Sequence, residues 1–208
     1  MKRTLEEHAE RFDEIAPEYD EDTTPEYRSA VSLVVEHAAP TETDTVLDLG
    51  TGTGAIALAV AEDADRVLGR DISEGMLDQA QTKAAECGLS NVTFDTGRFR
   101  EPNVPDGIAV DVVTSNFAMH HLSDEQKREA IGIVADLGAR RFVLGDVMFF
   151  GEPDPSDPFY SPAVDDPATV GVLADAFTDA GFALTAVERI HDQVGVLVGE
   201  RQENAEQR

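Results

Sequence analysis

Apolar residues follow two different periods along the chain. From residue 5 to residue 39 they recur at helical spacing, with interruptions around Pro17 and Pro25. From Thr45 onward, short β-rich runs alternate with amphipathic stretches. The first pattern predicts helices ahead of the main fold. The second predicts an α/β domain in which helices connect parallel strands by right-handed crossovers.

Five β-rich runs open this alternation: TVLDLG, DRVLGRD, NVTFD, AVDVVTSN and RRFVLGDVMFF. Helices are predicted among them at 55–62, 74–87 and 124–137. A loop rich in Pro and Asp follows at 151–167, then a helix at about 168–180 and two more strands, FALTAVERI and QVGVLVGE. Few residues separate these last two strands, so we expect an antiparallel hairpin. We expect a single domain with a helical cap (1–43), an α/β core (44–200) and a polar tail (201–208).

The chain is strongly acidic, with a formal net charge of -26 over 208 residues and lysine only at Lys2, Lys83 and Lys127. This composition resembles that of proteins from salt-loving microbes. In about 1 M salt the Debye length falls to roughly 3 Å, which screens self-repulsion. We therefore expect a halophilic protein whose stability depends on salt.

Composition also limits the partners and the compartment. The sequence shows no basic stripe of the kind that duplex binders need, so nucleic acid is an unlikely partner.

The one cysteine, Cys87, excludes a disulfide framework, and as a small apolar side chain at a helix end it is predicted to be buried. No apolar run approaches a membrane span and no signal-peptide core precedes the fold, so we expect a cytoplasmic protein without membrane contact. No zinc-spaced Cys and His and no HExxH motif appear, and no metal site is predicted.

The segment VLDLGTGTG carries the clearest chemical signal. It places Asp48 at the end of a strand and Gly50, Gly52 and Gly54 in the turn into a helix, where a ligand can approach the backbone amides. Gly50, Gly52 and Ala55 also satisfy the relaxed dinucleotide fingerprint, so the pattern alone does not choose between ligands. A P-loop is excluded because no Lys-Ser or Lys-Thr pair follows.

Two carboxylates narrow the choice of ligand. Asp48 would repel a pyrophosphate but suits the ammonium of a methionine moiety near a sulfonium, which favours S-adenosylmethionine over NAD. Its alternative role is to cap the following helix. Asp71, at the end of the second strand, can accept hydrogen bonds from both hydroxyls of a ribose, or it is a solvated acidic residue.

Four segments, VLDLGTGTG, VLGRDIS followed by EGMLDQA, NVTFDTG, and DVVTSNFAMHHL, resemble class I S-adenosylmethionine-dependent methyltransferases in order and spacing. The resemblance implies a Rossmann-like, doubly wound sheet of seven mostly parallel strands with an antiparallel last strand. It also implies an S-adenosylmethionine site formed by Gly50 and Gly52 at the methionine end, Asp71 at the ribose, Phe99 at the adenine, and Asn116 and Phe117 beneath the reactive end, with Ile72 as a further cofactor contact. Tyr19 is a candidate lid, or a helix-packing aromatic like Phe12.

One position departs from the family pattern. After Gly97 the family usually has an aspartate that binds the adenine amino group, whereas this chain has Arg98, which cannot accept that hydrogen bond. Arg98 can instead stack on the purine, or Asp95 can supply the acceptor.

The AMHH segment places His120 and His121 just beyond the fourth strand, near the expected entry of the methyl acceptor. A neutral imidazole there can remove a proton from the acceptor, and the two are candidate catalytic bases; the alternative is a helix start or a packing contact. The acceptor itself is expected to be a small molecule, and the oligomeric state stays open. A non-catalytic S-adenosylmethionine binder and a nicotinamide-dependent oxidoreductase are the alternative functions.

Overall fold

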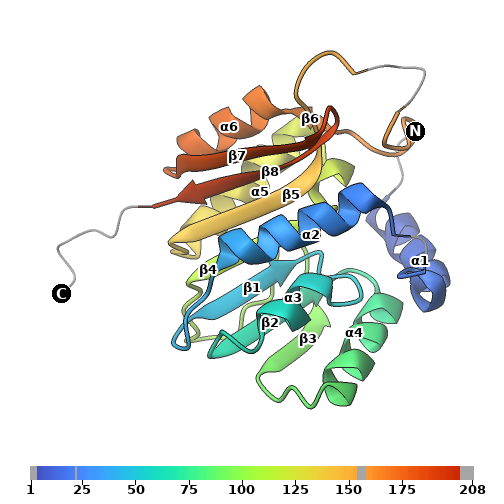
Figure 1. The fold of residues 1–208 in the computed structure, drawn as a ribbon, viewed down its shortest axis with the longest axis vertical. Helices are drawn as coiled ribbons and strands as arrows, with labels where there is room; N and C mark the ends of the chain where they lie inside the picture. The colour runs from blue at the N-terminus through green and yellow to red at the C-terminus, as the bar shows by residue number, and fades with distance from the viewer. Residues whose placement is uncertain (1–3, 22, 154–157, 202–208) are drawn as a thin grey trace.

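The computed structural model describes residues 4–21, 23–153 and 158–201. Seven strands form one sheet in the order β3-β2-β1-β4-β5-β8-β7 (Figure 1). Their bounds are β1 Thr45–Leu49, β2 Arg66–Asp71, β3 Val92–Thr96, β4 Val112–Asn116, β5 Arg141–Phe149, β7 Ala183–His191 and β8 Val194–Glu200. The last strand, β8, runs antiparallel to both β5 and β7, whereas the other pairs in this order are parallel. The predicted seven-stranded doubly wound sheet and its terminal hairpin are confirmed.

A two-residue strand, β6 (Ala168–Thr169), pairs with the end of β5 and was not predicted. The sequence suggested a helix from Ala168, but α6 spans Val170–Asp179, because the Thr169 side chain accepts a hydrogen bond from the Val172 amide and caps the helix. The chain thus returns to the sheet for two residues before the helix begins.

Helices cover both faces of the sheet, and alternate strand residues face each layer (Figure 1). On one face, Val46 of β1 and Val112 of β4 pack in a core with α2 (Pro25–Ala38) and α3 (Ala55–Val60). On the other face, Leu47 and Val113 pack in a core with α5 (Asp124–Asp136) and α6. Helix α4 (Glu74–Glu86) lies against β3 at the edge of the sheet.

The N-terminal segment forms the predicted helices with a break at the predicted place. α1 (Leu5–Ile15) continues into the short helix η1 (Ala16–Glu18), and Pro25 occupies the first turn of α2. α1 and the first turn of α2, through Tyr27, reach the carboxyl ends of the strands. The rest of α2 packs against β4, β5 and β8 and buries Ala30, Val34 and Ala38.

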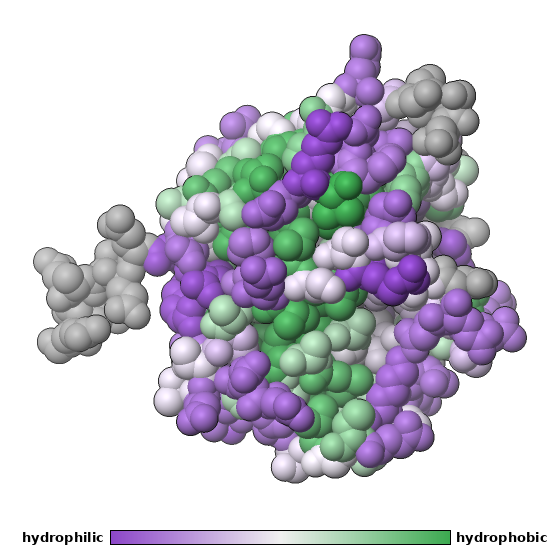
Figure 2. All heavy atoms as spheres, viewed as in Figure 1, coloured by the Kyte–Doolittle hydropathy of each residue, from purple (hydrophilic) through white to green (hydrophobic). Residues whose placement is uncertain are grey.

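The remaining observations concern Cys87, the lengths of the helices, the surface and the C-terminal tail. Cys87 is exposed, so the prediction of a buried thiol was wrong: the residue follows the last turn of α4, outside the apolar stripe of that helix. Among the described residues, no helix has the length and apolar character needed to cross a bilayer. On the face shown in Figure 2, hydrophilic residues dominate the periphery and hydrophobic ones gather toward the middle. Of the predicted tail, only Arg201 is described, and 202–208 lie outside the described residues.

Candidate active site

A cavity of about 350 Å³ opens at the carboxyl ends of β1, β2 and β4, where the strand order changes direction. Such a switch point is where ligands bind in open α/β sheets. Most of the residues predicted to bind ligand or substrate line this cavity: Tyr19, Asp48, Gly50, Gly52, Asp71, Ile72, Arg98, Phe99, Asn116, Phe117 and His121. His120 does not line it and is buried.

The glycine turn is folded back against β2. The amides of Gly50 and Thr51 both donate to the Arg70 carbonyl, at 2.8 and 3.0 Å. Gly50 has a φ of +70°, and a Cβ there would lie 2.3 Å from the Ala118 Cβ, so this position requires glycine. Gly52, with a φ of +52°, has no heavy atom within 4 Å of its Cβ position. The turn therefore packs tightly at Gly50 and is open at Gly52.

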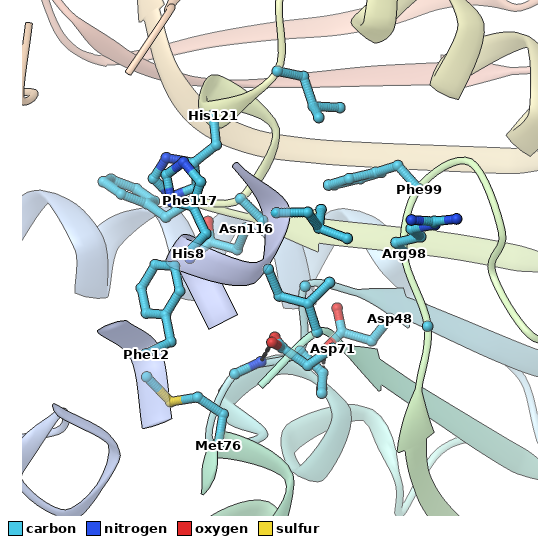
Figure 3. Close-up of a pocket in the computed structure, with 18 of the residues that line it drawn as sticks. His8, Phe12, Asp48, Asp71, Met76, Arg98, Phe99, Asn116, Phe117 and His121 are labelled. Carbon is cyan, nitrogen blue, oxygen red and sulfur yellow. Dashed lines mark hydrogen bonds between the residues drawn. The ribbon is translucent and has the colours of Figure 1, made fainter. Parts of the chain in front are cut away.

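Asp71 connects this turn to the end of β2. Its two carboxylate oxygens accept hydrogen bonds from the amides of Gly52, at 2.8 Å, and Ser73, at 3.0 Å. Figure 3 shows Asp71 among the residues that line the cavity. Burial raises the pKa of this carboxyl, and the amide hydrogen bonds oppose that shift. The Ile72 amide also contributes, and a carboxylate with about four lone-pair sites keeps the capacity to accept a hydrogen bond from a ligand.

Asp48 is buried below the turn. Its oxygens accept hydrogen bonds from the hydroxyls of Thr51, at 2.7 Å, and Thr114, at 2.8 Å. Burial raises the pKa of Asp48 to about 6, the two hydroxyls lower it, and the charge of Asp71 raises it further. A cationic ligand beside Asp48 would stabilise its ionised form.

The end of β4 forms the floor of the cavity. Asn116 is 8% exposed, and within the described part of the chain neither its amide nitrogen nor its carbonyl oxygen makes a hydrogen bond of ordinary geometry. The Tyr27 hydroxyl is near enough to interact with this side chain, which lowers the pKa of the phenol against the effect of burial. Phe117 has a φ of +53°, which is uncommon for a bulky residue and typical of functional sites. Both features indicate a binding surface for a polar ligand.

Phe99 and Arg98 form the wall at the far side of the cavity (Figure 3). They lie in the helix-free connection between β3 and β4, where Arg98 and Glu101 exchange two backbone hydrogen bonds of 2.9 Å. The Arg98 guanidinium also donates to Glu101, at 2.5 Å. Asp95, considered as an alternative adenine partner, is exposed on β3 and does not line the cavity.

Two histidine–carboxylate pairs lie at the opposite end. The Nδ1 atom of His121 is 2.8 Å from an oxygen of Asp165, and the Nδ1 atom of His120 is 2.5 Å from one of Asp146. Burial lowers the pKa of His121, whereas for His120 the charge and hydrogen bond of Asp146 overcome the effect of burial and raise the pKa. Candidate ligand atoms of His120, His121 and Asp165 lie within 4.8 Å of one another; within this group His121 is hydrogen-bonded to Asp165, whereas His120 is hydrogen-bonded to Asp146 outside it.

Sequence reasoning missed several residues of the cavity. Leu5, His8 and Phe12 of α1 line it at helical spacing, and the His8 ring lies 4.7 Å from that of His121, tilted by 43°. That spacing is a visible signal, although a helix face that covers a cavity looks like one that covers a core. Asp165 comes from the loop rich in Pro and Asp, whose sequence shows nothing that pairs it with a histidine 44 residues earlier.

The comparisons with known proteins agree with this geometry. Residues 46–137 match the model of a family described as a methyltransferase domain. The uncharacterized methyltransferase YcgJ of Bacillus subtilis is 31% identical over 118 residues, which cover 56% of this chain and 46% of that protein. An uncharacterized methyltransferase of Geobacillus is 29% identical over 150 residues, or 70% of this chain and 66% of that one. The chain thus spans about half to two thirds of the length of these relatives.

Solved structures share the fold. The crystal structure of YcgJ covers 85% of this chain and 100% of its own, with a TM-score of 0.69 and 21% identity. The [4+2]-cyclase SpnF superimposes over 98% of both chains, with a TM-score of 0.79 and 17% identity. The fold therefore accommodates different chemistries. The sequence comparison shows that residues 46–137 are similar to a methyltransferase domain, and the similarity in fold extends over most of the chain.

Proposed function

We propose that the cavity binds S-adenosylmethionine and that the protein transfers its methyl group to a small organic acceptor. One observation carries the proposal: the glycine turn, the Asp71 carboxylate and the Asn116 amide all open into the same cavity at the switch point of the sheet. These are groups that hold an amino acid moiety and a ribose. When bound, the cofactor supplies an electrophilic methyl group.

The residues present fit this cofactor. The turn at Gly50 and Gly52 would receive the methionine end, Asp71 the ribose hydroxyls, and Phe99 with Ile72 the adenine. Asn116 has both a donor and an acceptor to offer near the methionine end. Asp48 and Asp71 give this part of the cavity a negative charge, which suits an ammonium and a sulfonium and disfavours the pyrophosphate of NAD.

The way in which the N-terminal helices cover the cavity favours a small acceptor. α1 is joined to the end of β2 and the start of α4 through Asp13, whose Oδ1 atom accepts from the Ser73 hydroxyl, at 2.6 Å, and from the Gly75 amide, at 2.9 Å. Asp20, just beyond η1, accepts from the Thr53 hydroxyl, at 2.7 Å, and pairs with Lys83. A cavity covered in this way, in a chain with a net charge of -26, favours a small molecule over a polyanion.

Calorimetric titration in multimolar KCl tests the cofactor assignment. We expect saturable binding of S-adenosylmethionine and of S-adenosylhomocysteine, and no binding of NADH. Asp71→Asn should weaken S-adenosylhomocysteine binding by about 10- to 100-fold, because hydrogen bonds to a charged group contribute roughly 1.5–3 kcal/mol.

Asp95→Asn is the matched control. It removes a carboxylate from the neighbouring strand, in the register position opposite Arg70 and outside the cavity, and should leave binding unchanged. NADH binding without S-adenosylhomocysteine binding would support the oxidoreductase alternative. Cofactor binding without turnover of any acceptor would support a non-catalytic binder.

A further inference from the structure

We infer that His121 and Asp165 form a proton-accepting pair, and that the acceptor is an uncharged phenol or similar hydroxyl compound. His121 would be the catalytic base and Asp165 its positioning residue. This inference rests on the proposed methyl transfer. In that step the acceptor O–H proton moves to Nε2 of His121, the oxygen forms its bond to the methyl carbon, and the carbon–sulfur bond breaks to leave a neutral thioether.

The pair has the geometry that a base requires. Nδ1 of His121 lies 2.8 Å from one oxygen of Asp165, and the Ser161 amide donates to the other oxygen of that carboxylate, also at 2.8 Å. A carboxylate at Nδ1 keeps the proton on that nitrogen, so Nε2 is left with its lone pair for a ligand. The ring lines the cavity beside Phe117 and His8 (Figure 3).

The loop that carries Asp165 is held firmly. The Asp166 amide donates to the His120 carbonyl, at 2.7 Å. Lys127 of α5, only 2% exposed, donates to the Leu122 carbonyl, at 2.5 Å, and to the Asp166 carbonyl. A buried ammonium is costly unless such partners compensate it, so Lys127 fixes this loop against the short helix η2 (Met119–His121). Asp165 is thereby kept beside His121.

Charged and titratable groups approach His121 from every neighbouring element. They are His8 of α1, His120 of η2, Asp146 of β5 and Asp165 of the loop. Burial has the largest effect and lowers the pKa of His121, the charge of His120 lowers it further, and the two carboxylates act in the opposite direction. His121 is therefore neutral near pH 7 and can accept a proton, and Asp165 stabilises the imidazolium that forms.

The walls at this end select an uncharged acceptor. They include Leu5, Phe12, Phe117 and Leu122. The carboxylates and guanidinium groups among the described lining residues belong to Asp48, Asp71, Arg98 and Arg100, and Figure 3 shows the three labelled ones away from His121. A carboxylate acceptor would lack a cation there and would not need a base. An ammonium would lack a free carboxylate, whereas a planar phenol suits the aromatic rings.

Turnover of a panel of probes tests the inference: phenols of graded acidity from phenol to 4-nitrophenol, with benzoate and benzylamine as charged counterparts. We expect phenols to be methylated in preference to the charged probes. His121→Gln should lower kcat for phenol by ~10²–10⁴-fold, the usual contribution of a positioned base. The loss should shrink toward 4-nitrophenol, which ionises without help. S-adenosylhomocysteine affinity should stay unchanged, which separates lost chemistry from lost folding.

Asp165→Asn tests the positioning role. It should lower kcat less than His121→Gln, with little change in KM, and move the acidic limb of the pH profile to lower pH, because the carboxylate that raises the pKa of His121 is gone. His191→Gln and Asp192→Asn, exposed at the β7–β8 turn, are the matched controls and should leave both parameters unchanged.

Several outcomes would overturn the inference. Turnover confined to benzoate, or no turnover of any phenol by protein that binds S-adenosylhomocysteine, would reject the acceptor class and leave the cofactor site intact. Equal kcat losses for all phenols would reject the base. Activity lost in EDTA and restored by Zn²⁺ would assign His120, His121 and Asp165 to a metal ion instead. Absence of S-adenosylhomocysteine binding would reject the proposed function itself.

Discussion

The two ends of the cavity are built in different ways. The end with the glycine turn comes from the consecutive strands β1 and β2 and is held by amides of the turn: Gly50 donates to the Arg70 carbonyl and Gly52 to the Asp71 carboxylate. The end with His121 joins η2 to the loop at 158–167 through the Asp165 side chain, and α1 adds the His8 ring, which contacts the ring of His121. The turn has no room for a side chain at Gly50, whereas the side chains at the histidine end can be exchanged one at a time.

This difference fits the division of labour that we propose. A cofactor is the same in every turnover, so a rigid backbone site serves it well. Acceptors differ among proteins of one fold, and a site assembled from a helix and a loop can change without disturbing the sheet. The comparison predicts that substitutions at the glycine end affect folding and cofactor binding, and that those at the histidine end affect acceptor chemistry.

The largest expected effect is that of Gly50→Ala. The new Cβ would lie 2.3 Å from the Ala118 Cβ at a φ of +70°. Overpacking and left-handed strain together should lower the free energy of unfolding by about 4 kcal/mol. Thermal and KCl-supported urea unfolding would measure the loss.

Gly52→Ala is the matched control for this substitution. Its Cβ would meet no atom of the described chain within 4 Å, so only about 1 kcal/mol of backbone strain is expected, while S-adenosylhomocysteine binding should weaken because the methyl group occupies cavity space. Equal stability losses in the two variants would show that the turn is not packed as described.

The second effect concerns the pH dependence that Asp48 produces. Its folded pKa of about 6 exceeds the unfolded value near 3.8, so the folded state binds the proton more tightly. The ionised form is then penalised, and stability falls as the pH rises from about 4 through about 6, by about 3 kcal/mol in total. Asp48→Asn, which keeps the shape and can still pair with both threonines, should remove this fall.

The difference between wild type and Asp48→Asn isolates this residue from the other carboxylates, and exposed Asp95→Asn should keep the wild-type slope. S-adenosylhomocysteine carries an ammonium that would stabilise the ionised carboxylate, so its binding near pH 6 should release a proton from wild type and not from Asp48→Asn. Calorimetry in buffers of different ionisation enthalpy measures that proton. Identical pH profiles for wild type and Asp48→Asn would refute the buried, titrating carboxylate.

What the sequence could predict follows the same division. The alternation of strands and helices, the terminal hairpin and the glycine turn depend on local periodicity and on glycine, which can be recognised without knowledge of contacts, whereas the number of strands in the sheet came from the family resemblance. Asp71 was identified because parallel strands end at the same edge. Even the break between α1 and α2 was marked by Pro17 and Pro25.

At the histidine end of the cavity, only part of the site could be predicted from the sequence. His121 was visible beside β4, but Asp165 was not, because its position depends on the buried ammonium of Lys127 and on a backbone bond to His120. Such polar contacts between residues far apart in the sequence produce no periodic pattern in it. β6 was missed for a related reason: two residues that pair with the end of β5 cannot be distinguished from the first turn of a helix.

The smallest expected effect tests how the cap is joined to the glycine end. Asp13 accepts hydrogen bonds from the Ser73 hydroxyl and the Gly75 amide, and a Cβ on Gly75 would lie 3.0 Å from the Asp13 Cα, so the two helices are in close contact there. Because Asp13 is exposed, Asp13→Ala should cost only about 1 kcal/mol. The loss should appear as faster hydrogen exchange in α1 and faster release of S-adenosylhomocysteine, with global unfolding nearly unchanged. Glu14→Ala, exposed on the next position of the helix, should change neither rate. If Asp13→Ala lowered global stability as much as Gly50→Ala, α1 would be part of the cooperative core and not a separately opening cover.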